Sequence, residues 1–74
     1  MQPLFSTELT INNQPVLYHV VFEKDQYEFL PEDTEKEAFS FIRKHDEWQE
    51  LGIIEPQLKS QAIEKLEAYL LAQL

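Results

Sequence analysis

The sequence predicts one α+β domain, in which a three-stranded antiparallel β-meander is followed by two α-helices packed on one face of the sheet (βββαα). Three observations support this fold class. Two segments of alternating polarity flank one tight-turn pair, a second such pair introduces a third strand, and the C-terminal segment has helical periodicity. With 74 residues and no repeat or low-complexity stretch, the chain is expected to form a single domain, residues 1–74.

The meander is predicted from its two turns. Leu4 to Ile11 alternates with period two, which indicates a half-buried strand. Asn12-Asn13 follows, and asparagine tolerates the left-handed backbone that a two-residue hairpin loop requires. A second strand is expected from about Val16 to Glu23. The turn at Lys24-Asp25 then leads into a third strand, which Pro31 ends because it has no N–H for the ladder.

The two turns also predict the register of the strands. A loop at Asn12-Asn13 places Leu9 opposite Val16, and a loop at Lys24-Asp25 places Val20 opposite Phe29. Both pairings put the same set of side chains on one face, called the aromatic face below. Its members are Phe5, Leu9, Ile11, Val16, Tyr18, Val20, Phe22, Tyr27 and Phe29.

Two helices are predicted after the meander. Thr34 and Glu37 match a capping box, so a first helix is expected from about Glu35 to Leu51. Gly52 is expected just after its end, and Ile53-Ile54 is expected as a buried connector. Along this helix the expected apolar arc is Ala38, Phe41, Ile42, His45 and Trp48.

The C-terminal segment gives the strongest helical pattern. Pro56 suits a first turn, where its missing N–H has no helical partner, and no glycine or proline follows. The apolar side chains that share one arc at 100° per residue are Leu58, Ala62, Ile63, Leu66, Tyr69 and Leu70.

Composition narrows the classes of partner. The net charge of -8 and the sequence pI of about 4.5 oppose binding to nucleic acid or to an anionic membrane. With no cysteine there is neither a disulfide framework nor a thiolate nucleophile. The sequence contains no segment typical of a membrane span or a signal peptide, so a cytoplasmic location is expected.

Catalytic and metal sites are not predicted. Ser6, Ser40 and Ser60 lack the flanking glycines of a nucleophile elbow, and a single glycine leaves no phosphate-binding loop. On the predicted helix, His45 and Asp46 point about 100° apart and do not converge on a metal. We therefore expect no catalytic residue, no cofactor and no metal.

A run of acidic residues is the first candidate binding feature. It carries a net charge of 1 − 6 = -5 over residues 25–37, since one lysine offsets six carboxylates. The run can be a patch for a basic partner, a site for a hard cation, or only a solvated face that ends in an acidic helix N-terminus. Its carboxylates are Asp25, Glu28, Glu32, Asp33, Glu35 and Glu37.

The second candidate is the apolar surface left over once the helices cover the aromatic face. Such patches often mark interfaces, although scattered exposed leucines are also common in monomers. The residues of this candidate interface are Leu4, Leu17, Val21, Leu30 and Leu71. The first strand can also be a sheet edge able to pair with another strand.

These observations favour a non-enzymatic protein–protein interaction module or small subunit that binds another protein or itself, with a homodimer expected. The alternative is an acidic inhibitor that occupies a basic site on its target, as a nucleic-acid mimic or an immunity-like protein does. The second interpretation requires the carboxylates of the acidic run to cluster in space. Strong salt dependence of binding would distinguish it from an apolar interface.

Overall fold

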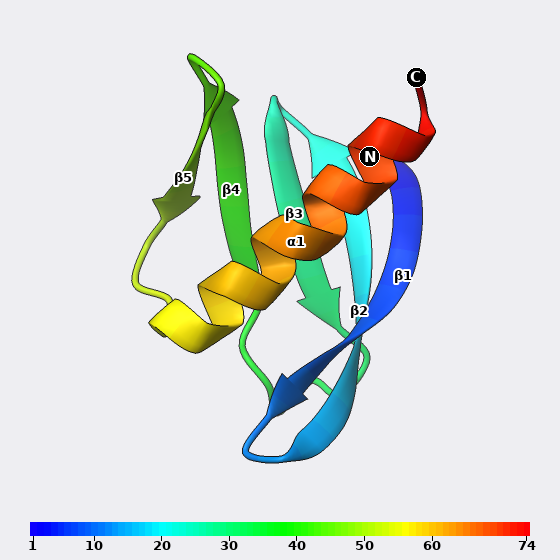
Figure 1. The fold of residues 1–74 in the computed structure, drawn as a ribbon. Coiled ribbons are helices and arrows are strands. Elements are labelled where there is room, and N and C mark those ends of the chain that lie inside the picture. Colours follow the sequence, from blue (N-terminus) through cyan, green and yellow to red (C-terminus); the bar gives the residue numbers. More distant parts are fainter.

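The computed structural model describes residues 1–74 and consists of a five-stranded antiparallel sheet with one helix across it. The strands follow one another in chain order, so every strand pairs with its neighbours in sequence (Figure 1). The elements are β1 (Gln2–Ile11), β2 (Gln14–Glu23), β3 (Gln26–Pro31), β4 (Phe39–Lys44), β5 (Glu47–Leu51) and α1 (Pro56–Ala72).

The predicted fold class was therefore wrong in its second half. The segment predicted as a helix from Glu35 to Leu51 forms a loop followed by the β4–β5 hairpin. Its side chains also alternate with period two, and that pattern prevails because it extends the aromatic face. Phe39 stacks on Phe29 with ring centroids 4.9 Å apart, and Phe41 meets Phe29 edge to face at 5.9 Å. A helix would withdraw these two rings from the sheet.

Three two-residue turns build the hairpins. At each turn both residues have a positive φ, although none of the six is glycine. This left-handed backbone matches the twist of the flanking strands. The turns lie at Asn12-Asn13, Lys24-Asp25 and His45-Asp46, the last inside the segment predicted to be helical. His45 is therefore an exposed turn residue and does not lie on the apolar arc of a helix, where it was expected. Gly52 has φ +97° but follows a strand.

The predicted register of the first three strands is confirmed. Leu9 pairs with Val16, and Val20 pairs with Phe5 on one side and Phe29 on the other. The register shifts between Pro3 and Phe5, which marks a bulge near the start of β1.

Helix α1 covers the aromatic face, as Figure 1 shows. Ala62 and Leu66 are fully buried against the sheet, so the predicted apolar arc faces the core. The other sheet face, called the open face below, carries no helix. The buried cluster consists of Leu9, Val16, Tyr18, Val20, Phe29, Phe39, Phe41, Ala62 and Leu66.

Polar contacts tie the helix to β4 and β5. Lys59 Nζ lies 2.6 Å from Glu50 Oε2, and this hydrogen bond lowers the pKa of the Glu50 carboxyl. Arg43 is 3.9 Å from Glu67 and also lies over the ring of Trp48, 4.6 Å from its centroid.

The indole N–H of Trp48 is buried without a hydrogen-bond partner.

Candidate functional site

A pocket of about 400 Å³ opens where four segments meet at one end of the sheet. The end of β1, the β3–β4 loop, the β5–α1 connector and the first turn of α1 gather there, while the β2–β3 and β4–β5 turns lie at the other end (Figure 1). This volume lies within the usual range of ligand pockets. The lining residues are Thr10, Ile11, Asn12, Tyr18, Glu35, Lys36, Glu37, Ala38, Phe39, Ile53, Ile54, Glu55, Gln57 and Leu58.

Apolar side chains of the core reach this pocket. Tyr18 and Phe39 are buried, and Ile11, Ile54 and Leu58 pack against the same cluster. The Tyr18 hydroxyl donates a hydrogen bond to the backbone oxygen of Glu37 at 3.0 Å. Burial raises the pKa of this hydroxyl, and the nearby carboxylate of Glu37 raises it further. The hydroxyl therefore stays protonated and holds the β3–β4 loop against the sheet.

The rim of the pocket is acidic. Glu35, Glu37 and Glu55 contribute three carboxylates against the single ammonium of Lys36. The β3–β4 loop is ordered by Asp33, whose carboxylate accepts a hydrogen bond from the Glu35 N–H at 3.0 Å and whose backbone oxygen accepts one from the Lys36 N–H at 3.0 Å. An apolar floor with a negatively charged rim suits a ligand that is part apolar and part cationic.

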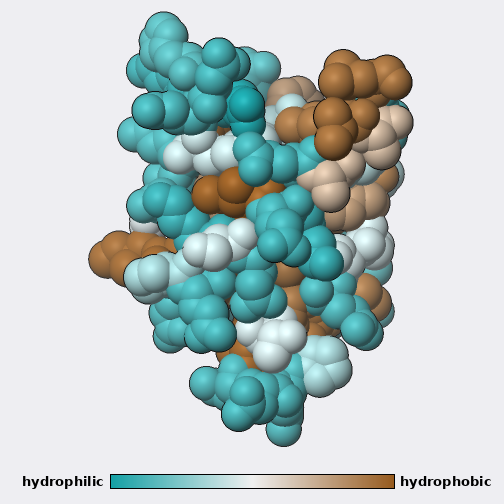
Figure 2. All heavy atoms as spheres, in the orientation of Figure 1, coloured by the Kyte–Doolittle hydropathy of each residue, from teal (hydrophilic) through white to brown (hydrophobic).

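Ile53 stands at the rim of this pocket and is fully exposed. The prediction that Ile53-Ile54 forms a buried connector was therefore wrong for the first residue. Gly52 precedes this pair with a positive φ, and after it Ile54 packs against the core while Ile53 lies in solvent. In Figure 2 an apolar projection stands out at the β5–α1 connector, surrounded by hydrophilic surface.

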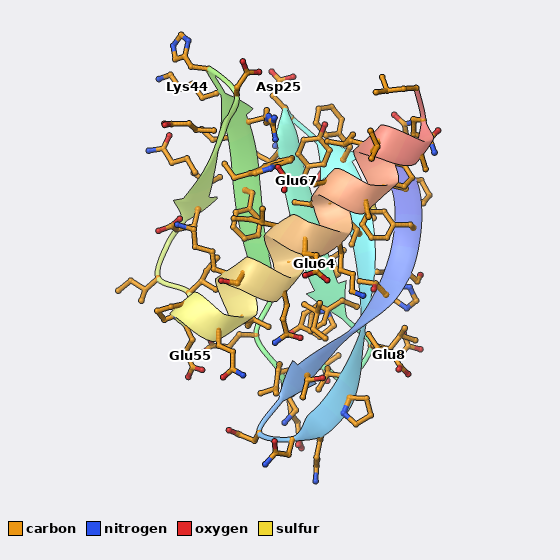
Figure 3. The ribbon with its side chains drawn as sticks, viewed as in Figure 1. Glu8, Asp25, Lys44, Glu55, Glu64 and Glu67 are labelled. Carbon is orange, nitrogen blue, oxygen red and sulfur yellow. The ribbon has the colours of Figure 1, made fainter.

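The acidic run does not form one patch. Asp25 lies in the β2–β3 turn, at the end of the sheet away from Glu55, as Figure 3 shows. Glu28 lies on β3 and pairs with Val21 of the open face. Only Glu35 and Glu37 line the pocket, while Asp33 orders their loop.

The five residues of the candidate interface are also dispersed. Val21 lies on the open face but is only 5% exposed, between Pro3 and Glu28 in register. Leu17 is 38% exposed on the same face. Leu30 is half-buried on the neighbouring strand.

The other two residues of that set lie elsewhere. Leu4 packs against the core, because the bulge near it breaks the alternation of β1. Leu71 is 71% exposed near the end of α1, on the other side of the sheet from Leu17. Figure 2 shows an apolar area at this end of the helix.

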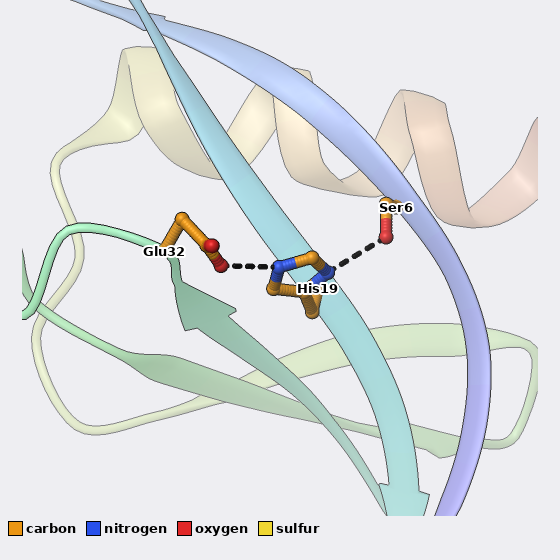
Figure 4. A network of polar contacts seen from close by, with 3 residues as sticks. All are labelled: Ser6, His19 and Glu32. Atoms are coloured by element: carbon orange, nitrogen blue, oxygen red, sulfur yellow. Dashed lines mark hydrogen bonds and ion pairs between the residues drawn. The ribbon is translucent and has the colours of Figure 1, made fainter.

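A Ser–His–Glu network joins β1, β2 and the start of the β3–β4 loop on the open face (Figure 4). His19 Nδ1 lies 2.8 Å from Ser6 Oγ, and His19 Nε2 lies 2.6 Å from Glu32 Oε2. The hairpin register aligns the first two residues, and a bond from the Glu32 N–H to the Leu17 oxygen at 2.9 Å brings in the third. This network was not predicted from the sequence, although the predicted register already places Ser6 opposite His19.

The network resembles a hydrolase triad in composition, but its surroundings differ from a catalytic site. Hydrolytic triads act in water-excluded clefts, where donors stabilise the developing oxyanion. The side chains of His19 and Glu32 are 44% and 66% exposed, and neither residue lines the pocket. In this setting the network links β1, β2 and the β3–β4 loop.

Comparisons with known proteins give no relative for this chain. A scan against protein-family models found no match, and neither the search of curated proteins nor that of solved structures found one. No helix is long and apolar enough to cross a membrane. No group of three or more histidine, cysteine, aspartate or glutamate side chains is placed to hold a metal ion.

Proposed function

We propose that this protein is a non-enzymatic interaction module that holds a segment of a partner protein in the pocket at the start of α1. The observation that carries the proposal is the fully exposed Ile53 beside an apolar floor and an acidic rim. Burying one such side chain against a partner stabilises a complex by roughly 1.5–3 kcal/mol. A solvated isoleucine at a pocket mouth is therefore an anchor for binding.

The proposed occupant has two chemical features. An apolar side chain fills the floor formed by Tyr18, Phe39 and Leu58, and a neighbouring lysine or arginine meets the rim carboxylates of Glu35 and Glu37. The charge at the rim sets orientation and speed of association, whereas the floor and Ile53 supply most of the affinity. The proposal includes the cytoplasmic location expected from the sequence, which cell fractionation tests.

A tagged-protein pull-down with matched variants tests this function. Ile53→Asp changes the pocket mouth, and Leu74→Asp makes the same kind of change at a side chain that is 99% exposed at the C-terminus. A partner that binds wild type and Leu74→Asp but is lost from Ile53→Asp supports the proposal. A partner that Ile53→Asp retains would show that binding takes place elsewhere.

An acidic inhibitor remains a second candidate, because three carboxylates surround the pocket. Its binding would depend on charge more than on Ile53. A double variant, Glu35→Gln with Glu37→Gln, and a rise in ionic strength from about 0.05 to 0.5 M would then abolish capture of the partner. Capture that survives both changes but is lost in Ile53→Asp would favour the apolar anchor over this alternative.

A further inference from the structure

Strand β1 forms one edge of the sheet and pairs only with β2. Its outer edge carries backbone groups that a further strand could bind. In a two-residue hairpin the residues flanking the loop form a hydrogen-bonded pair, and such pairs then alternate along the ladder. With Ile11 opposite Gln14, the backbone N–H and C=O groups of Thr10, Glu8 and Ser6 point outward.

The two ends of this edge are closed. Gln61 of α1 bonds both outward groups of Thr10: its Oε1 accepts from the Thr10 N–H at 2.8 Å, and its Nε2 donates to the Thr10 oxygen at 2.9 Å. At the other end, the bulge between Pro3 and Phe5 interrupts the ladder. Ser6 and Glu8 are exposed between these ends, and their outward groups have no bond to a side chain.

A second copy of this chain fits the open part of the edge in one register. Antiparallel pairing must bring outward residues opposite each other. Pairing Glu8 with Glu8 of the second copy places like charges opposite each other. It also brings Ser6 opposite Thr10, whose outward backbone groups are already bonded to Gln61. Pairing Ser6 with Ser6 requires the bulged residue Leu4 to pair with Glu8. Pairing Ser6 with Glu8 in both directions uses all four free residues, and the ladder then ends on each side where Thr10, bonded by Gln61, comes opposite the bulged Leu4.

We infer that the chain forms a homodimer through β1, with Thr7 on the two-fold axis and Ser6 of each copy opposite Glu8 of the other. Four backbone hydrogen bonds join the edges into a ten-stranded sheet with both helices on the same face. On the helix side, Thr7 faces Thr7 of the second copy, which is a favourable cross-strand pair. The interface is short, so association is expected only at high protein concentration. It does not involve Ile53 and is independent of the proposed pocket function.

Disulfide trapping tests the register, because the chain has no cysteine. On the axis, the two Cα atoms of residue 7 are about 4.5 Å apart, within the range that a disulfide bridges. Thr7→Cys should therefore give a covalent dimer on mild oxidation. Thr10→Cys should not, because its two copies are about 20 Å apart in this register. Cross-linking that is equal in the two variants, absent from Thr7→Cys, or stronger in Glu8→Cys overturns the proposal.

Sedimentation equilibrium tests the backbone pairing without cross-links. The wild-type mass should rise from 8.8 kDa towards twice that value as the concentration approaches about 1 mM. Glu8→Pro removes only an outward N–H and leaves the ladder with β2 intact, so the fold should persist by circular dichroism. The loss of two hydrogen bonds per dimer should weaken association about thirtyfold.

Glu8→Ala is the matched control, because it changes the same side chain but keeps the N–H, and it should still dimerise. A wild-type mass that stays at 8.8 kDa, or equal association of Glu8→Pro and Glu8→Ala, contradicts pairing through β1. If Glu8→Pro fails to fold, the comparison of Thr7→Cys with Thr10→Cys still decides the proposal.

Discussion

Replacing Gln61 with alanine removes the only side chain that bonds the outer backbone of β1. The amide of Gln61 bonds the N–H and the C=O of Thr10 much as the backbone of a neighbouring strand would. It therefore both fastens the helix to the strand edge and closes that edge. The Gln61→Ala variant tests whether the bonds between Gln61 and Thr10 form in solution.

The expected loss of stability follows from the two bonds, at 2.8 and 2.9 Å. Each intramolecular hydrogen bond contributes about 0.5–1.5 kcal/mol net to stability. Both bonds between Gln61 and Thr10 are exposed to solvent. Gln61→Ala should lower the free energy of unfolding by about 1–2 kcal/mol. For a domain of this size that corresponds to a fall in Tm of about 5–15 °C.

The assay is urea denaturation followed by Trp48 fluorescence, with Gln57→Ala as the control. Gln57 lies one turn earlier on the same helix, so this variant makes the same substitution without removing a hydrogen bond to β1. Amide hydrogen exchange gives a second measurement. Exchange at Thr10 should become about tenfold faster or more, while the amides of Leu9 and Ile11, which face β2, should change little.

Equal stability of the Gln61→Ala and Gln57→Ala variants would refute this account of the contact. So would unchanged exchange at Thr10. Either result would mean that the β1 edge is also open at Thr10, and that the register derived for the dimer loses one of its two limits.

Three further changes test the core, a turn and the pocket floor. Leu66→Ala should cost about 3 kcal/mol in urea denaturation because the side chain is fully buried, whereas Leu71→Ala should change stability by less than about 0.5 kcal/mol. Asp46→Gly should raise stability by about 0.5–1 kcal/mol, measured as a higher Tm, because φ is +64° there; a lower Tm would contradict the assigned turn. The pKa of the Tyr18 hydroxyl is raised in the folded protein, so this hydroxyl loses its proton at a lower pH in the unfolded chain than in the folded one. The free energy of unfolding should therefore fall as pH rises above about 10. Tyr18→Phe should lack this alkaline fall when unfolding is measured from about pH 8 to 11, and an unchanged profile would show that another group causes it.

Local sequence was sufficient for the first half of the fold and for the last helix. A two-residue loop leaves only one register, so Asn12-Asn13 and Lys24-Asp25 specified the pairing of three strands. From Pro56 onward, strong helix formers and one continuous apolar arc agree.

The structure of residues 35–51 was predicted wrongly, because both a helical period and a strand period of two fit these residues. Phe41 and Trp48 lie on one arc of a helix but also on one face of two strands. A capping box at Thr34 and Glu37 favoured the helix locally. The sequence also held a contrary signal, since Lys44-His45-Asp46-Glu47 resembles the earlier turn Glu23-Lys24-Asp25-Gln26.

The candidate site could be predicted only in part. Glu35 and Glu37 were noticed as acidic residues, but the pocket is lined by residues 10–12, Tyr18, residues 35–39 and residues between 53 and 58, which lie far apart in sequence. No periodicity encodes such a meeting. Ile53 was expected to be buried because it is as apolar as Ile54. The sequence does not indicate which of the two consecutive isoleucines faces the core.

Short-range rules of turn geometry and side-chain period thus specified two hairpins, one helix and the aromatic face that unites them. The packing of distant segments decided the rest. Phe39 and Phe41 join the sheet because they pack against Phe29 there. The free energy gained by burying these rings exceeds the small stability of an isolated helix. As a result the sheet has five strands and a single helix covers it, and Ile53 is exposed beside the pocket.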